Sequence, residues 1–283
     1  MKTALRLALT LGLLAAVIWQ VAPADLGAAL AGLQPGWLAL AVAALALQIA
    51  LSALRWRLTA RGLGHALPRD WAMREYGLSV AANSFLPGGV LGDAARIARS
   101  RHLGWGDAAG SVLIERLAGQ VALAALVPLS LALWLGAGVA ASAALGGLVL
   151  CLVLLRLFPA GARLLARAWL GPGIWHAQAA LTLAILAVNI GGFWAAALAV
   201  GITLTPTMAL ALLPPVLLAM LIPLTVNGWG IREGVAAALW PAFGISAAQA
   251  VAASMAYGLA CMGAALLGLL PWLMTRAEGA RQA

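Results

Sequence analysis

The stretch NSFLPGGVLGDAARI, residues 83–97, interrupts an apolar chain with a proline, two adjacent glycines and an aspartate. The chain has 283 residues, of which 64% are hydrophobic and 9% are charged. Soluble domains carry about 25% charged residues, whereas apolar runs of the ~20 residues that cross a bilayer recur throughout this sequence. The composition predicts an all-α polytopic membrane protein, with residues 1–283 forming a single transmembrane domain.

The distribution of the basic residues predicts the topology. Apolar runs at residues 5–22 and 36–54 precede Arg55 and Arg57, so two crossings return the chain to its starting side. All Lys and Arg residues except Arg232 can lie on that side, which the positive-inside rule identifies as the cytoplasm. The formal net charge of +9 therefore indicates orientation in the membrane, with both termini cytoplasmic, rather than binding to nucleic acid.

The N-terminal run also fits a second interpretation. Ala22-Pro23-Ala24 after a basic start and an apolar run has the form of a signal peptide with its cleavage site. We favour a retained first helix, because the next run then enters from the outside and brings its arginines to the cytoplasm.

The quoted stretch lies within residues 76–101, a segment that begins and ends among cytoplasmic arginines but is too short for two crossings. We expect a re-entrant hairpin that breaks at Pro87, Gly88 and Gly89 and returns as a short helix through Asp93. Non-helical backbone at this depth requires surrounding protein or a wet cavity. The alternative is that the proline and glycines only kink a closely packed helix.

A second interruption, LIPLTVNGWGIREGVAAALW, occupies residues 221–240 and is expected on the opposite side of the membrane from the first. Its flanking runs start and end outside, so we expect a hairpin from the other leaflet with its tip at residues 227–230. Arg232 and Glu233 would each cost about 2.5–3.5 kcal/mol at mid-membrane, and therefore require partners or a polar cavity. An interfacial loop is the alternative for this pair.

The two interruptions place residues 36–135 and 175–273 in corresponding patterns of helix, hairpin and helix, which predicts an inverted repeat. Interrupted segments at matching places in inverted halves indicate the substrate site of a transporter. The six expected crossings lie around residues 5–22, 36–54, 107–135, 138–157, 175–198 and 246–273.

Other polar residues have structural as well as functional interpretations. Glu115 and Arg116 are either an interfacial pair that reaches the headgroups or part of the site. Asp93 also suits the first turn of a helix on dipole grounds alone. We expect no metal site and no cofactor, because the histidines have no Cys or carboxylate at ligand spacing.

Four segments, LRWRLTARGLG, NSFLPGGVLGDAARIARSRHLGW, SVLIERLAG and IPLTVNGWGIREG, resemble the membrane domain of lysylphosphatidylglycerol synthases. The resemblance covers nearly the whole chain and implies a lipid flippase of the bacterial cytoplasmic membrane. The aminoacyl-transfer domain of the two-domain relatives is not expected here. The positions that match the family's motifs, and so are implied as substrate-binding, are Asn83, Pro87, Gly88, Gly89, Gly92, Asp93, Glu115, Arg116, Asn227, Gly228, Gly230, Arg232 and Glu233.

The expected function is movement of an anionic, phosphate-bearing lipid, or of a polyprenyl- or hopanoid-type lipid, between leaflets. We expect the phosphate at the helix N-termini near residues 88–89 and 228–230, with Arg232 as a donor. No ATP-binding loop occurs, so an ion gradient or a partner must supply energy, and Asp93 and Glu233 suggest proton coupling. The alternatives are a membrane-embedded lipid-modifying enzyme and a non-catalytic accessory subunit of envelope assembly.

Overall fold

The computed structural model describes residues 3–86, 90–171, 173–222 and 224–274, and within these ranges every regular element is a helix. The α-helices are α1 Thr3–Gln20, α2 Pro23–Ala31, α3 Pro35–Gly62, α4 Arg69–Phe85, α5 Leu91–Arg99, α6 Trp105–Leu135, α7 Ala137–Leu157, α8 Pro159–Leu170, α9 Trp175–Ala199, α10 Pro206–Ala219, α11 Ile231–Leu239 and α12 Ala247–Leu267. The short turns η1 Arg101–Leu103, η2 Val226–Gly228 and η3 Trp240–Phe243 join some of them.

Five helical segments are long and apolar enough to cross a membrane. Their bounds are Pro35–Gly62, Trp105–Leu135, Ala137–Leu157, Trp175–Ala199 and Ala247–Met274. These segments match five of the six expected crossings. The chain is therefore a multi-pass helical membrane protein, as its composition predicts.

The expected first crossing at residues 5–22 is only half of a bent pair. Leu5–Gln20 and Pro23–Ala31 together are long and apolar enough for a span, but they meet at an angle of 89°. The bend has a local cause, because Ala22 has a φ of 61° and Pro23 begins a new helix. A straight crossing at this position is therefore not what the structure shows.

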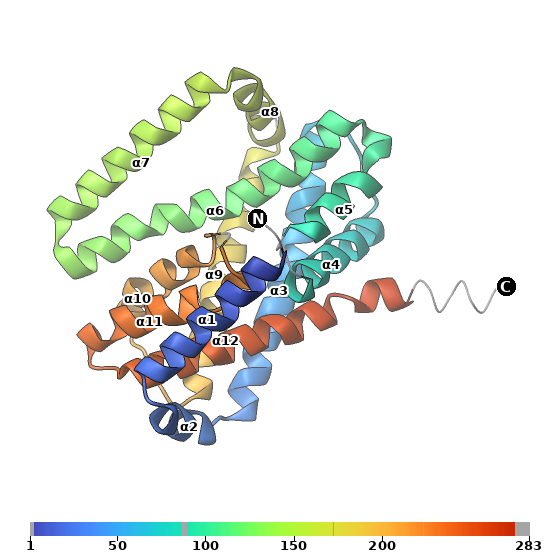
Figure 1. The fold of residues 1–283 in the computed structure, drawn as a ribbon. Coiled ribbons are helices and arrows are strands. Elements are labelled where there is room, and N and C mark those ends of the chain that lie inside the picture. The colour runs from blue at the N-terminus through green and yellow to red at the C-terminus, as the bar shows by residue number, and fades with distance from the viewer. Residues whose placement is uncertain (1–2, 87–89, 172, 223, 275–283) are drawn as a thin grey trace.

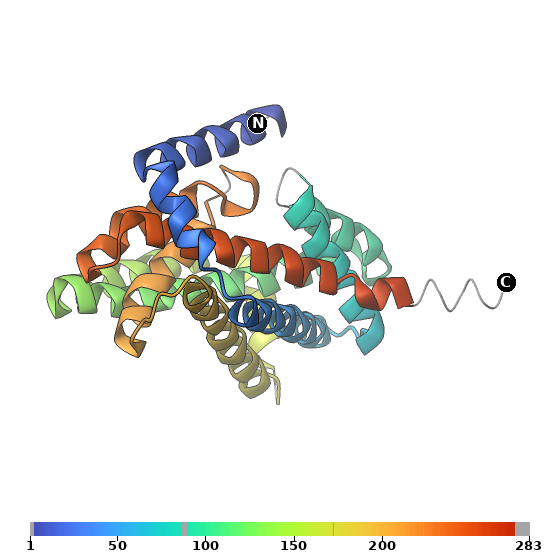
Figure 2. The same cartoon turned by 90° about the horizontal axis from the view of Figure 1, so that it is seen from below.

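The core forms where α3, α9, α10 and α12 pack together, with α12 running through the middle of the molecule (Figure 2). Alanines recur along α12, and Ala250, Ala253, Ala256 and Ala260 are all 0% exposed. Small side chains allow membrane helices to approach closely. This core holds the helices that carry the polar residues described below.

In contrast, α7 lies at the edge of the molecule, where it connects α6 to α8 (Figure 1). None of its residues is buried. Its exposed leucines and valines suit contact with lipid chains, since other helices leave much of their surface uncovered.

Each interrupted stretch contains the break between two short helices. We call these the first helix pair (α4 and α5) and the second helix pair (α10 and α11). In the first pair, Asn83 Oδ1 accepts a 2.8 Å hydrogen bond from the Gly92 amide. In the second pair, Asn227 and Gly228 have positive φ angles of 50° and 76° between the helices. Asn and Gly are the residues that adopt this conformation most readily.

Helix α1 packs against α11 of the second helix pair and against η2 (Figure 2). Thr10 Oγ1 accepts a 2.9 Å hydrogen bond from the Val226 amide. A Cβ atom at Gly230 would lie 2.7 Å from the Cβ of Leu13, and the φ of 87° at Gly230 is also unfavourable for other residues. The close approach of α1 therefore requires glycine at this position.

Candidate functional site

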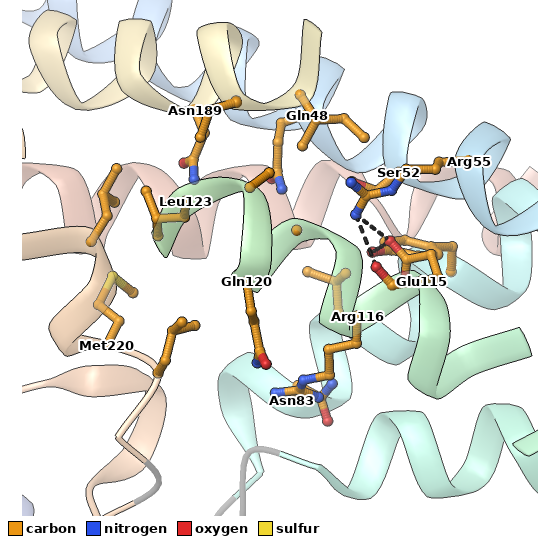
Figure 3. A pocket seen from close by; sticks show the side chains of 18 of the residues that line it. Gln48, Ser52, Arg55, Asn83, Glu115, Arg116, Gln120, Leu123, Asn189 and Met220 are labelled. Atoms are coloured by element: carbon orange, nitrogen blue, oxygen red, sulfur yellow. Dashed lines mark hydrogen bonds and ion pairs between the residues drawn. The ribbon is translucent and has the colours of Figure 1, made fainter. Parts of the chain in front are cut away.

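A cavity of about 320 Å³ with charged, polar and apolar lining residues lies between the two helix pairs and the helices α3, α6, α9 and α12 (Figure 3). Its charged lining residues are Arg55, Asp93, Arg96, Glu115 and Arg116. A second cavity of about 140 Å³ continues from it between the ends of the helix pairs, and Asn83, Arg116 and Asn227 line both cavities. The two interrupted stretches thus meet at one polar space.

Arg55 reaches this cavity from α3, along a polar stripe on an otherwise apolar helix. Gln48, Ser52, Arg55 and Thr59 follow one another at intervals of four, three and four residues, which places them on one helical face. Arg55 is only 3% exposed, so it is part of the protein interior rather than the interfacial cation that the charge distribution predicts. The stripe is the sequence signal that could have identified it.

Glu115 connects Arg55 to the first helix pair. Its Oε1 accepts hydrogen bonds from Arg55 Nη2 at 2.9 Å and from the Tyr76 hydroxyl at 3.2 Å. Its Oε2 lies 3.6 Å from Arg96 Nη2. Glu115 is 2% exposed, so both oxygens of this buried carboxylate are held by protein groups.

Asp93 is held in the same way, but closer to the second cavity. Its carboxylate accepts hydrogen bonds from Ser79 at 3.1 Å and Asn83 at 3.1 Å. It also pairs with Arg96 Nη2 at 3.0 Å and with Arg116. The dipole of the helix N-terminus is not needed to explain Asp93, because four side chains bind it directly.

Arg96 joins the two carboxylates and has donor capacity remaining. Its guanidinium lies 4.7 Å from the ring centroid of Trp56 and 4.5 Å from that of Tyr76, where cation–π attraction stabilises it. Arg96 is 2% exposed, and its Nε and Nη1 have no hydrogen-bond partner among the described residues; the same holds for Nε of Arg55. These N–H groups are enclosed by protein, so an acceptor in the cavity reaches them only if the side chains move.

The cavity has an excess of positive charge, because three arginines face two carboxylates. A buried charged donor that lacks an acceptor costs about 1–3 kcal/mol or more. An anion in the cavity would balance this excess positive charge. The site therefore favours an anionic ligand.

Arg232 and Glu233 form a separate buried pair behind the cavity. Both are 0% exposed, and Arg232 Nη2 lies 2.5 Å from Glu233 Oε1. Ser254 from α12 accepts from Arg232 Nε at 2.8 Å and donates to Glu233 Oε1 at 2.9 Å. The pair thus binds α11 to α12.

The helix N-terminus beside this pair is occupied by the protein's own carboxylate. Glu233 Oε2 accepts a 2.6 Å hydrogen bond from the Gly230 amide. Tyr257 lines the cavity, and its ring centroid lies 5.4 Å from the Arg232 guanidinium. Tyr257 therefore lies between the ligand space and the pair, and the pair lines neither of the two cavities described above.

The structure separates the thirteen residues implied by the sequence into groups. Asn83, Asp93, Glu115, Arg116 and Asn227 line the main cavity, and Gly228 lines the second. Gly92, Gly230, Arg232 and Glu233 support the helix pairs from outside these linings. Pro87, Gly88 and Gly89 lie outside the described residues.

Several lining residues are not among the site residues that the sequence indicates: Gln48, Ser52, Arg55, Tyr76, Ser79, Arg96, Gln120, Thr182, Asn189 and Tyr257. Most are single polar residues on apolar helices, where only the three-dimensional packing shows which face turns inward. Among the described residues, no group of three or more His, Cys, Asp and Glu side chains is placed to hold a metal ion.

Gly92 has a packing role that predicts a stability effect. A Cβ atom at Gly92 would lie 2.0 Å from the backbone oxygen of Ser79, so Gly92→Ala must force α5 away from α4. We expect a loss of about 1–3 kcal/mol, as for other overpacked sites, measured by thermal unfolding in detergent. Gly106→Ala is the matched control, because nothing lies within 4 Å of that position; equal stability of the two variants would contradict this packing role.

The helices and the cavity define a polytopic membrane protein with charged and polar side chains lining a space inside the helical bundle. Residues 3–268 match the family model described as the lysylphosphatidylglycerol synthase TM region. The chain belongs to this family. No curated protein sequence matches the chain.

Proposed function

We propose that this protein is a lipid transporter that moves an anionic, phosphate-bearing lipid between the leaflets of the bacterial cytoplasmic membrane. The observation that carries the proposal is the cavity in which three arginines face two carboxylates. Phosphate is the anionic group that membrane lipids carry. Membership of the family supports a membrane role but leaves the substrate to be tested.

The phosphate site of this proposal lies between Arg96 and Arg116. Arg116 is 39% exposed, in contrast to the buried Arg96, so a headgroup can approach it from the second cavity. The planar guanidinium fork suits two phosphate oxygens at once. Arg232 supports the fold in this account, because its Nε and Nη2 bind Glu233 and Ser254, and its Nη1 contacts the Met220 sulfur.

The depth of the cavity supports a route for the headgroup through the membrane. Glu115 lies ten residues after the start of α6, which is roughly 15 Å along a helix, and Gln120 lies farther in. Polar side chains at this depth are expensive unless they serve a polar pathway. A headgroup can therefore cross while its acyl chains remain in lipid.

The two helix pairs are, in this proposal, re-entrant hairpins from opposite leaflets in an inverted repeat. Their support is that residues of both pairs, including Asn83 and Asn227, line the same cavity. Movement of one half against the other would open the cavity to alternate leaflets. The arginine distribution supports cytoplasmic termini.

A lipid-modifying enzyme has less support from the same residues. Asp93 and Glu115 are each bound by two arginines, so the protein's own groups engage both carboxylates rather than presenting them to a substrate. An accessory subunit would need no such cavity. Transport is therefore the function that uses the observed geometry best.

Reconstitution into vesicles tests the proposal. Phosphatidylcholine vesicles carry a trace of phosphatidylglycerol with a fluorophore on its acyl chain, and dithionite quenches only the outer leaflet. Protein-containing vesicles should lose nearly all fluorescence, whereas protein-free vesicles should keep about half. Equal quenching of the two preparations would contradict lipid movement.

Proton coupling, if it supplies the energy, is better assigned to Asp93 than to Glu233. Asp93 lines the cavity and shares Arg96 and Arg116 with the proposed phosphate, so the lipid competes directly with this carboxylate. A displaced carboxylate with fewer cationic partners takes up a proton more readily. Ser79 and Asn83 are the other groups that face it.

Asp93→Asn should therefore abolish the dependence of lipid movement on an imposed pH gradient while downhill movement persists. Glu233→Gln is the comparison variant, because Glu233 lies outside the cavity lining. The measurement is the initial rate of reporter movement with and without the gradient. Wild-type rates that do not respond to the gradient would remove proton coupling and leave the cavity assignment intact.

A further inference from the structure

We infer that the transported headgroup joins its phosphate to an uncharged, hydroxyl-bearing group such as glycerol, inositol or a sugar, rather than to an amine. This inference rests on the proposed function and concerns the part of the cavity beyond the arginines. Gln48 from α3 and Asn189 from α9 give this part a polar but neutral lining, and Gln120 from α6 points toward Asn83 and Arg116 (Figure 3). The hydroxyls of Ser52 and Thr182 add to it.

The three amides have capacity to bind a polyol. Gln48 and Gln120 form no side-chain hydrogen bond with other described residues, and Asn189 Oδ1 accepts one from Tyr257 at 2.7 Å. An amide offers both donors and an acceptor, and a hydroxyl group likewise donates and accepts. Amides along the cavity therefore match a headgroup that carries several hydroxyls.

An amine would find no free carboxylate in this cavity. The carboxylates among its lining residues are Asp93 and Glu115. Arg96 and Arg116 bind the first, while Arg55 and Arg96 bind the second. An ammonium group placed here would add positive charge beside three arginines, which is unfavourable.

The lining tyrosines are also engaged, so they provide no aromatic cage for a quaternary ammonium. The Arg96 guanidinium lies 4.5 Å from the centroid of Tyr76. Phe193 stacks on Tyr257 with 4.4 Å between ring centroids, and Arg232 lies 5.4 Å from the same ring. The carboxylates and the tyrosine rings of the lining are therefore occupied by the protein's own groups.

The test compares headgroups of equal net charge in the reconstituted full chain. Phosphatidylcholine vesicles carry acyl-labelled reporter lipids with glycerol, inositol or serine headgroups, each with one net negative charge. The glycerol and inositol reporters should move roughly tenfold faster than the serine reporter, as expected for about two additional neutral hydrogen bonds. Equal rates for serine and glycerol would overturn the inference while leaving lipid transport standing.

Variants of the neutral lining connect the preference to these residues. Gln48→Met and Gln120→Met keep the side-chain length but remove the amide, so the ratio of glycerol to serine rates should fall several-fold. Gln20→Met is the control, because Gln20 is exposed at the end of α1 and far from the cavity lining. An unchanged ratio in both lining variants would contradict the role of the amides.

Soluble polyol phosphates carry the same chemical groups as these lipid headgroups. A separate uptake experiment therefore distinguishes a lipid substrate from a soluble one. Uptake of radiolabelled glycerol 3-phosphate into the vesicles is measured beside reporter movement. Movement of the glycerol reporter without uptake supports the lipid headgroup. Uptake without reporter movement would overturn the lipid as substrate, and failure of every reporter to move would remove the proposed function itself.

Discussion

Arg232→Ala should destabilise the protein by about 3–5 kcal/mol, because it leaves the Glu233 carboxylate buried without its cation. Both side chains are 0% exposed, and Ser254 is the remaining partner of Glu233 on α12. The packing around Arg232 is tight, since the ring centroid of Trp229 lies 4.9 Å from its guanidinium. Thermal unfolding of purified protein in detergent measures the loss.

The double variant Arg232→Met with Glu233→Gln is the control for this effect. Neutral residues of similar volume remove both charges, so the double variant should be more stable than Arg232→Ala. Arg232→Lys should likewise affect folding more than lipid binding. A stable Arg232→Lys protein that no longer binds phosphate-bearing lipid would instead support the role in headgroup binding that the sequence predicts for Arg232.

Arg96→Lys should impair lipid transport by roughly a hundredfold while the protein remains folded. Lysine keeps a positive charge opposite Asp93 and Glu115, but it lacks the planar guanidinium fork that binds two phosphate oxygens at once. Loss of two charge-assisted hydrogen bonds, at about 1.5 kcal/mol each, corresponds to this factor. The initial rate of movement of a phosphatidylglycerol reporter measures it.

The control for Arg96→Lys is Arg99→Lys on the same helix. Arg99 is 38% exposed and pairs with Glu75 outside the cavity lining, so transport should remain near wild type. Unfolding temperatures of both variants show whether the fold survives. A folded Arg96→Lys protein that transports at the wild-type rate would contradict the phosphate site.

Apolar runs predict most of the membrane-spanning helices, because hydrophobic length alone decides whether a helix can cross. Residues 107–135 and 175–198, for example, correspond closely to α6 and α9. The first run fails as a straight crossing because the bend depends on Ala22 and Pro23 rather than on hydrophobicity. Pro23 indicates a possible break in the sequence, but hydropathy alone does not predict the bend.

The interrupted stretches predict where the site lies better than which residues line it. Asp93 and Asn227 do line the cavity. However, Arg55 and Arg57 differ only in helical face: Arg55 binds Glu115, whereas Arg57 Nε donates to the Leu67 carbonyl at 2.7 Å. Charge counting treats the two residues alike, and only packing separates them.

Arg232 illustrates a different case. Its isolation among apolar residues makes it the obvious phosphate donor, yet its neighbour Glu233 binds it and also caps the helix at Gly230. A glutamate three residues after a helix cap is a known capping signal. The sequence therefore contains evidence for a structural carboxylate, but not for where its pair is buried.

The central claim is that a lipid headgroup passes through the cavity, and covalent capture tests it most directly. In a background with Cys151→Ala and Cys261→Ala, Gln120→Cys places a thiol in the cavity lining, whereas Val121→Cys places one on the 63%-exposed outer face of α6 at the same depth. The probe is a phospholipid with a maleimide on its headgroup, and intact-mass spectrometry detects the adduct. We expect lipid adducts on the Gln120→Cys protein and none on the Val121→Cys protein; adducts confined to the Val121→Cys protein, or equal on both variants, would contradict a headgroup route through the cavity.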